Sequence, residues 1–254
     1  MLLISILITD QDGGPKELPP TVRENIDSLR AFYPGFEHRL FDRAACREII
    51  AKDFDREVLA SFDKLKPFAF QSDLARLCLL YQLGGVYADL SVYFFSRWPP
   101  ANTAAEVSSI RKLAIFRDFC GVAPWQVANT IIFAPRQHKA LEKAIDMICI
   151  NVKNEYYGCS SLSPTGPDPF GKAIALTCMP EELITGDSVF TLPEVRPGSK
   201  QMVTEASHCF VFLDKLCAVK RKRMGGSLSE LGIPGGNQYN DLWLARDVYR
   251  KPNA

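Results

Sequence analysis

Three charged side chains stand at positions where charge is costly. Asp73 and Arg76 interrupt the segment 68–81, which is otherwise almost entirely apolar. Their spacing of three residues places them next to each other on one surface of a helix. Charges in a core helix destabilise it unless they are paired or contact a ligand. The third, Asp89, follows a short apolar run, and a carboxylate at a strand end is typical of ligand sites in open α/β sheets.

Glycine marks the boundary between the elements that must position these charges. Gly84 and Gly85 fit a helix C-terminus in the left-handed conformation, so the helix is expected to run from Phe68 to these glycines. Residues 86–88 then form a strand that ends at Asp89. Ser91 lies two residues further on, and alternate residues of a strand point the same way. Both side chains are therefore predicted to face one divalent cation.

The rest of the chain alternates apolar runs with amphipathic segments, which indicates an α/β protein. Thr21 and Asp42 are expected to cap helices, and Asp55 to begin one. Strands are predicted at Leu2–Thr9, Phe36–Phe41, Leu113–Arg117, Val127–Ala134, Val189–Leu192 and Cys209–Leu213, and further helices at Thr21–Phe32, His138–Val152, Phe170–Thr177 and Tyr239–Tyr249.

Composition excludes several classes of protein. A net charge of +1 and 23% charged residues give no reason to expect a nucleic-acid partner. The basic run Lys220–Arg223 leaves two interpretations open, a solvated loop or a patch that meets a diphosphate or an anionic lipid-linked acceptor. No apolar run approaches the roughly 18 residues of a membrane span, so we expect peripheral membrane contact at most. The eight cysteines contain no CxxC pair, which favours reduced core thiols in a cytosolic protein.

The segment around the three charges resembles a known family. Its pattern is S-D-x-x-R, a leucine-rich helix, G-G-x-Y and an acidic residue, and it is similar to the sugar-donor-binding region of DxD glycosyltransferases. These are the OCH1-like and capsular polysaccharide transferases (family 32) and, more distantly, the clostridial glucosylating toxins. Ser91 stands where the family has its second Asp. The matching residues are Ser72, Asp73, Arg76, Gly84, Gly85, Tyr87 and Asp89.

This resemblance implies a GT-A-like α/β fold in a single domain, residues 1–254, with a mixed, mainly parallel sheet flanked by helices. The donor-binding core is expected at about 1–135 and the acceptor and lid elements at about 136–254. The implied enzyme is a polysaccharide biosynthesis enzyme of a bacterial type. Because the sequence shows no apolar span and no signal peptide, we expect it in the cytoplasm, either free or at the inner face of the membrane. It would transfer a sugar from a nucleotide-sugar to a glycan or lipid-linked acceptor, with retention of the anomeric configuration. A UDP-sugar is expected as the donor in preference to a GDP-sugar.

The resemblance also implies roles for individual residues. Asp73 and Arg76 would contact the donor, and Asp89 would hold Mn²⁺ or Mg²⁺ with the diphosphate, so these three are the catalytic candidates. Because a hydroxyl is a weaker ligand than a carboxylate, Ser91 predicts weaker metal binding first. A shell completed by another residue and an enzyme that works without metal stay open as alternatives. His208 is a further candidate ligand. Tyr87 would lie beside the donor.

Three segments later in the chain complete the predicted site. Asn129 is an amide inside an apolar strand and must find partners there. The turn 165–167 (Thr-Gly-Pro) resembles a loop near the donor or acceptor. Asp241 and Trp243 match a closing tail that reaches the diphosphate or the metal. Each also has a purely structural alternative. Asn129 would be an amide whose hydrogen bonds are satisfied within the fold, and 165–167 an ordinary turn. Asp241 would be a helix cap and Trp243 a core residue.

Two other functions remain open at this point. Ser91 is compatible with a degenerate, non-catalytic nucleotide-sugar-binding protein. A nucleotidyltransferase is the second alternative, but it usually has a Gly-rich, basic loop after the first strand. The loop 10–20 here has Lys16 as its one basic residue.

Overall fold

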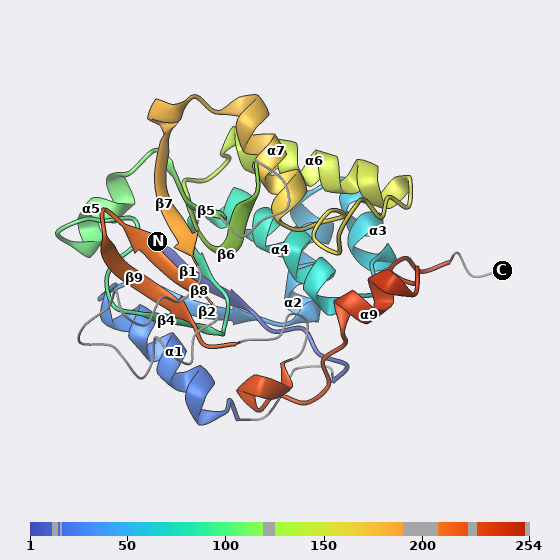
Figure 1. Ribbon diagram of the computed structural model, residues 1–254, viewed down its shortest axis with the longest axis horizontal. Helices are drawn as coiled ribbons and strands as arrows, with labels where there is room; N and C mark the ends of the chain where they lie inside the picture. The colour runs from blue at the N-terminus through green and yellow to red at the C-terminus, as the bar shows by residue number, and fades with distance from the viewer. Residues whose placement is uncertain (12–14, 16, 119–124, 190–207, 223–227, 252–254) are drawn as a thin grey trace.

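The computed structural model describes residues 1–11, 15, 17–118, 125–189, 208–222 and 228–251. In this part of the chain one sheet of nine strands has the order β2-β1-β3-β6-β5-β7-β8-β9-β4 (Figure 1). The strands are β1 Leu2–Ile6, β2 Glu37–Phe41, β3 Gly85–Ala88, β4 Val92–Phe94, β5 Leu113–Asp118, β6 Val127–Ala134, β7 Leu183–Val189, β8 His208–Phe212 and β9 Lys215–Lys220.

The sheet is mixed, as predicted, but the prediction that it is mainly parallel is wrong. Among the described strands three pairings are parallel, β1 with β2, β1 with β3, and β5 with β7. Five are antiparallel. One reason is the β8–β9 hairpin, whose two-residue turn, Leu213 and Asp214, has positive φ at both positions. Such a turn suits a hairpin but usually carries Gly or Asn, so the sequence did not indicate it.

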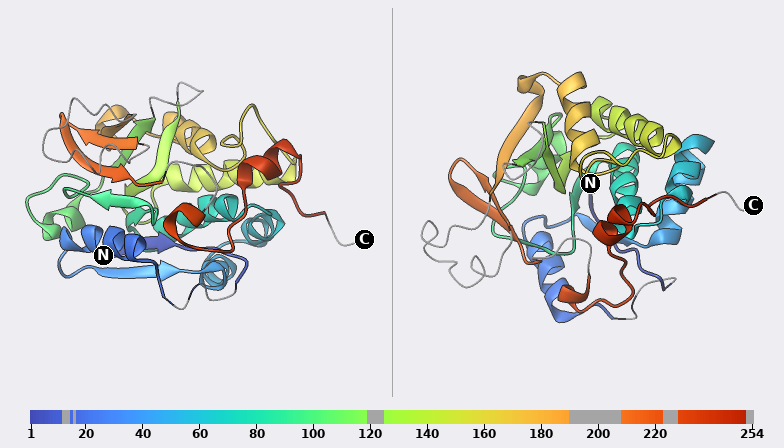
Figure 2. Two further views of the ribbon diagram at one scale, coloured as in Figure 1. Left: turned by 60° about the horizontal axis from the view of Figure 1, so that its bottom comes forward. Right: turned by 45° about the vertical axis from the view of Figure 1, so that its right-hand side comes forward.

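Helices cover both faces of the sheet. The α-helices are α1 Pro20–Ala31, α2 Arg43–Asp53, α3 Arg56–Lys64, α4 Phe68–Leu83, α5 Ala104–Ser109, α6 Lys139–Lys153, α7 Pro167–Thr177 and α9 Tyr239–Leu244. Figures 1 and 2 show α2, α3, α4, α6 and α7 grouped together, away from α1 and α5. Successive strand residues follow this division, since Ile4 and Tyr87 pack in the cluster of α4 and α6, whereas Leu3 and Val86 pack in that of α1 and α5. Burial of both faces explains the continuous apolar runs.

The predicted helix, glycine stop and strand are confirmed. Gly84 caps α4 with φ +63°, and Gly85 opens β3 with φ +122°. A Cβ on Gly85 would lie 2.2 Å from the carbonyl oxygen of Leu2. The second glycine thus permits close packing of β3 against β1, and the pair fixes the direction in which β3 leaves the helix.

Other local predictions have mixed outcomes. Asp42 and Asp55 cap α2 and α3 as expected. The cap assigned to Thr21 is wrong, because α1 begins at Pro20 and no side chain caps it. Strand β7 begins at Leu183, earlier than the strand placed at Val189–Leu192, and residues 190–192 lie outside the described part. The last helix ends at Leu244, and α5, β4 and β9 were not foreseen.

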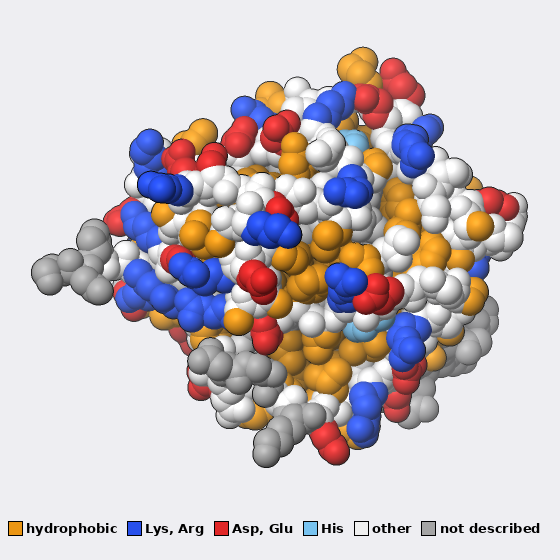
Figure 3. All heavy atoms as spheres, turned by 180° about the vertical axis from the view of Figure 1, so that it is seen from behind, with side chains coloured by type: hydrophobic (Ala, Val, Ile, Leu, Met, Phe, Trp, Pro, Cys, Tyr) orange, Lys and Arg blue, Asp and Glu red, His pale blue; other side chains and the backbone are white. Residues whose placement is uncertain are grey.

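The surface and the thiols agree with the composition. All seven described cysteines are free, and five of them are buried; Cys120 lies outside the described residues. Figure 3 shows basic and acidic side chains interspersed around a central hydrophobic area, as the near-zero net charge suggests. Within the described residues no helix is long and apolar enough to cross a membrane.

Candidate active site

A cavity of about 450 Å³ lies at one edge of the sheet, where several strand ends meet. The carboxyl ends of β1, β3, β5, β7 and β9 reach it, together with the amino ends of β6 and β8 and the first half of α4. This convergence is the position at which α/β sheets bind ligands. The charged side chains in its lining are Asp73, Arg76, Asp89, Asp118, Lys220 and Lys222.

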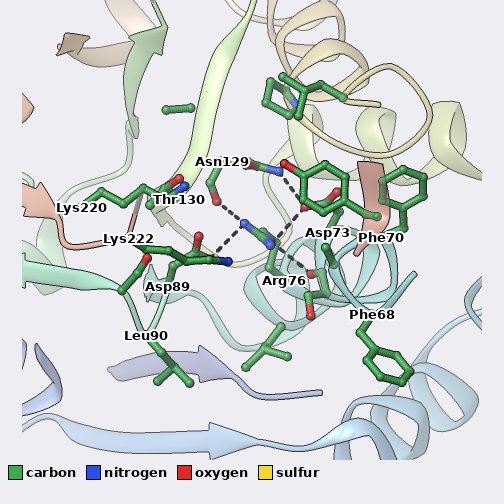
Figure 4. A pocket seen from close by; sticks show the side chains of 18 of the residues that line it. Phe68, Phe70, Asp73, Arg76, Asp89, Leu90, Asn129, Thr130, Lys220 and Lys222 are labelled. Carbon is green, nitrogen blue, oxygen red and sulfur yellow. Dashed lines mark hydrogen bonds and ion pairs between the residues drawn. The ribbon is translucent and has the colours of Figure 1, made fainter. Parts of the chain in front are cut away.

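Arg76 is the centre of the hydrogen-bond network in this cavity. It is only 5% exposed. Its Nε donates to the carbonyl oxygen of Ser72 at 3.2 Å and its Nη1 to that of Asn129 at 2.6 Å. It also forms ion pairs with Asp73 at 3.1 Å and Asp89 at 3.3 Å. Figure 4 shows the guanidinium between the two carboxylates, so one buried cation links α4, β6 and the end of β3.

Electrostatics keep Arg76 charged. Burial opposes its charge, but Tyr87, Asp89 and Asp73 together raise its pKa above the usual value. The guanidinium carbon also lies 4.7 Å from the centroid of the Tyr87 ring, a cation–π contact. A permanently charged, rigidly held guanidinium is suited to positioning an anionic or hydroxyl-rich ligand.

Asp73 is held from three elements. Its Oδ1 accepts a hydrogen bond from Nδ2 of Asn129 at 2.8 Å, and its Oδ2 accepts one from Oγ1 of Thr165 at 2.8 Å. Burial raises the pKa of this carboxyl, while the charge of Arg76 lowers it. The contacts bring together β6, the loop before α7 and α4, although these segments are far apart in the sequence. The sequence indicated each of these segments as part of the site, but it did not predict the contacts between them.

Asp89 lies directly after β3, as predicted, with its side chain in the cavity. The hydroxyl of Tyr87 donates to its Oδ1 at 2.6 Å, and Arg76 pairs with the same oxygen. Burial raises the pKa of Tyr87 well above its usual value, so the hydroxyl remains a donor. One carboxylate oxygen is thus fixed by the protein, which sets the orientation of the group toward the cavity.

The residues near Asp89 fit a divalent cation that is shared with a ligand. Ser91 is buried and lines the cavity, but it lies in the turn after β3 and not on a strand. The described part of the chain has no group of three or more His, Cys, Asp or Glu arranged to hold a metal. Mg²⁺ is commonly held by one or two carboxylates plus substrate phosphates. One carboxylate and one hydroxyl suit that arrangement better than a preformed protein site.

The cavity lining also contains groups that the sequence indicated only in part. His208, at the start of β8, lines it, and burial and the charge of Lys220 lower the pKa of this imidazole. A neutral imidazole is the form that ligates metal. Asp118 ends β5 in the lining and was overlooked, although it carries the same signal as Asp89, a carboxylate at a strand end.

The two predicted tail residues lie elsewhere. Asp241 is exposed, and neither it nor Trp243 is among the residues that line the cavity. The indole N–H of Trp243 donates to the carbonyl oxygen of Tyr157 at 2.7 Å. From the same helix, Tyr239 does line the cavity, beside Phe68 and Phe70, and it forms part of an aromatic wall.

Comparisons with known proteins find related sequences and folds. A family model described as capsular polysaccharide synthesis protein matches residues 12–157, more than half of the chain. An uncharacterized glycosyltransferase, L373 of Acanthamoeba polyphaga mimivirus, is 28% identical over 79 residues, which are 31% of this chain. The match spans about a third of the length of that relative, 32%.

Two solved structures resemble the fold. The ligand-free glycosyltransferase domain of the YGT toxin is 10% identical, with 72% of this chain and 79% of that chain covered and a TM-score of 0.50. The PaToxG glycosyltransferase is 15% identical, with 97% and 84% covered and a TM-score of 0.49. The YGT likeness shows that this chain has the fold of a glycosyltransferase domain.

Proposed function

The chain belongs to the capsular polysaccharide synthesis protein family, and we propose that it is a glycosyltransferase that uses a nucleotide-sugar donor. The observation that carries this proposal is the cluster of Asp73, Arg76 and Asp89 in one cavity at the sheet edge. The mimivirus relative, which is named a glycosyltransferase, and the shared toxin-domain fold support it.

In this proposal the ion pair of α4 binds the donor sugar or its ribose. Oδ1 of Asp73 accepts a hydrogen bond from Asn129 and pairs with Arg76, whereas Oδ2 accepts one hydrogen bond, from Thr165. A carboxylate oxygen has two acceptor sites, so a ligand hydroxyl would use the second site of Oδ2, while Asn129 and Thr165 keep the carboxylate in place. Arg76 and Tyr87 fix Asp89, so the three acidic and basic groups act as one preorganised unit.

Asp89 and Ser91, with His208 as a third candidate, would hold a divalent cation together with the donor diphosphate. Such a cation supplies positive charge against the leaving group. Because the protein offers one carboxylate and one hydroxyl near this position, we propose Mn²⁺ or Mg²⁺ dependence that is weak. Asp241 and Trp243 remain candidates for a closing segment, since the helix that carries them also places Tyr239 in the cavity lining.

The finer assignments rest on the family resemblance. We propose a UDP-sugar as donor, a glycan or lipid-linked saccharide as acceptor, and retention of configuration. Retention would follow from front-face attack, in which the acceptor oxygen bonds to the anomeric carbon as the bond to the diphosphate breaks. The departing phosphate oxygen takes the acceptor proton. A single-domain organisation and a cytoplasmic location stay predictions.

A panel of UDP- and GDP-sugars tests the proposal. Hydrolysis of each donor is followed with and without Mn²⁺, and the anomer released is read by proton NMR before it equilibrates. We expect turnover of at least one UDP-sugar with retention. Inversion of the anomeric configuration would contradict the front-face mechanism. Absence of turnover on the whole panel, with and without a saccharide acceptor, would contradict the enzymatic function.

Ser91 favours one alternative, a nucleotide-sugar-binding protein without catalysis. Its hydroxyl replaces the second carboxylate of the family pattern and lies buried in the cavity. Isothermal titration with UDP-sugars separates the two functions. Micromolar binding without turnover on any donor would favour the alternative.

A further inference from the structure

Two lysines at the end of β9 are part of the cavity wall. Lys220 ends β9, and both it and Lys222 line the cavity. Arg221 between them points to the other side, where its Nη1 pairs with Glu24 at 2.9 Å and its guanidinium lies 5.8 Å from the ring of Tyr93. Alternation along an extended chain therefore places the two lysines on one face, which is the face of the cavity.

Backbone pairing fixes these lysines beside Asp89. Lys220 is in register with Val92 of β4, and the amide of Arg221 donates to the carbonyl oxygen of Ser91 at 2.8 Å. The end of β9 is thus tied to the turn that carries Asp89 and Ser91. Figure 4 shows Lys220 and Lys222 extending from the same side, Lys220 toward Thr130 and Lys222 past Asp89 toward Arg76.

The two lysines add positive charge to the wall of the cavity in which Arg76 also lies. Lys222 is half-buried, and burial and the charge of Lys220 lower its pKa, an effect that Asp89 and Glu230 oppose. An anionic ligand between two ammonium groups on one concave wall is attracted by both of them.

We propose that Lys220 and Lys222 bind the diphosphate of the donor directly and share the neutralisation of the leaving group with any cation at Asp89. This inference rests on the proposed function. Lysine suits the task because its ammonium acts on phosphate oxygens as a compact charge. It also gives a reason why the single carboxylate of Asp89 suffices to hold the cation, since part of the positive charge that the leaving group requires comes from the two lysines.

Binding of UDP, inorganic pyrophosphate and uridine in excess EDTA, measured by isothermal titration calorimetry, tests the proposal. The variants are K220M and K222M, with K222R as the charge-retaining change and K215M as the matched control, because Lys215 is an exposed lysine of the same strand. We expect each methionine variant to weaken UDP binding about tenfold or more, the effect of losing a hydrogen bond to a charged group. The affinity for uridine should be the same in all variants, and K222R and K215M should bind UDP about as tightly as the wild type.

The outcomes separate this inference from the proposed function. If wild-type protein binds UDP in EDTA while K220M and K222M bind it equally well, the lysine proposal alone is wrong. If the wild type binds no nucleoside diphosphate and turns over no nucleotide-sugar, with or without Mn²⁺, both fail. A K222M protein that keeps UDP affinity but no longer sediments with phosphatidylglycerol vesicles would also overturn the proposal, in favour of a membrane contact. If circular dichroism shows that K222M is unfolded, the UDP affinity of K220M decides whether the proposal holds.

Discussion

Replacement of Arg76 by methionine tests the network at the centre of the site. Methionine keeps the length and much of the volume of arginine but removes every donor. Asp73 is 9% exposed, and it would lose its nearest cation while remaining buried. Removal of one partner of a buried ion pair typically costs about 3–5 kcal/mol. For a chain of this size each kcal/mol lowers the melting temperature by about 2–4 °C, so we expect a fall of roughly 6–20 °C.

The cost should depend on pH with a defined sign. Burial raises the pKa of Asp73 above its usual range, and Arg76 lowers it again. In R76M this lowering is absent, so the native carboxyl binds its proton more tightly than the unfolded one. Stability from such a group is present at low pH and is lost as pH rises through the native pKa. The deficit of R76M relative to wild type should therefore be larger at pH 8 than at pH 5.

Urea unfolding at both pH values, with the double variant D73N/R76M as control, measures this effect. Because the asparagine side chain carries no charge, the double variant should recover about 1–3 kcal/mol of the loss in R76M. An R76M protein within about 1 kcal/mol of wild type at pH 8, or a double variant no more stable than R76M, would refute the interpretation of this cluster as a coupled buried network.

Three further substitutions test individual contacts. T165V removes the hydroxyl that donates to buried Asp73 and should cost about 1–3 kcal/mol in urea unfolding; an unchanged midpoint would show that this bond contributes nothing. Y87F removes one of the two contacts that hold Oδ1 of Asp89 and leaves the ion pair with Arg76. It should lower kcat/KM about tenfold, equivalent to one charged hydrogen bond, whereas wild-type kinetics would count against orientation by Tyr87. S91D adds a carboxylate and should lower the Mn²⁺ concentration for half-maximal turnover about tenfold; no change would place the cation elsewhere.

Sequence alone predicted the elements whose signals are local. The helix α4 and its end at Gly84 follow from composition and from glycine geometry, and both agree with the structure. The spacing of Asp73 and Arg76 correctly indicated a neighbouring pair on one helix surface. By contrast, the bonds of Asp73 to Asn129 and Thr165 cross 56 and 92 residues of chain. Contacts of that range depend on the tertiary fold and have no signal in a single sequence.

The elements that were missed illustrate the same limit. Strand β7, residues 183–189, contains Gly186 and Asp187, which usually weaken a strand. In the sheet a Cβ at position 186 would lie 2.5 Å from the ring of Phe116, so packing requires glycine there. Similarly, the basic end of β9 resembles a loop, yet pairing with β4 makes it a strand. In both cases neighbours in space decide the conformation.

The most direct test of the account is the turnover of the preferred nucleotide-sugar by D89N, with D53N as a matched control at an exposed position outside the cavity lining. Asparagine keeps the size of Asp89 but removes the charge that pairs with Arg76 and would hold the cation. We predict a fall in kcat of at least about a hundredfold, the range for loss of a group that stabilises the leaving charge, with folding retained. Full turnover by D89N would contradict the assignment of this cavity as the active site.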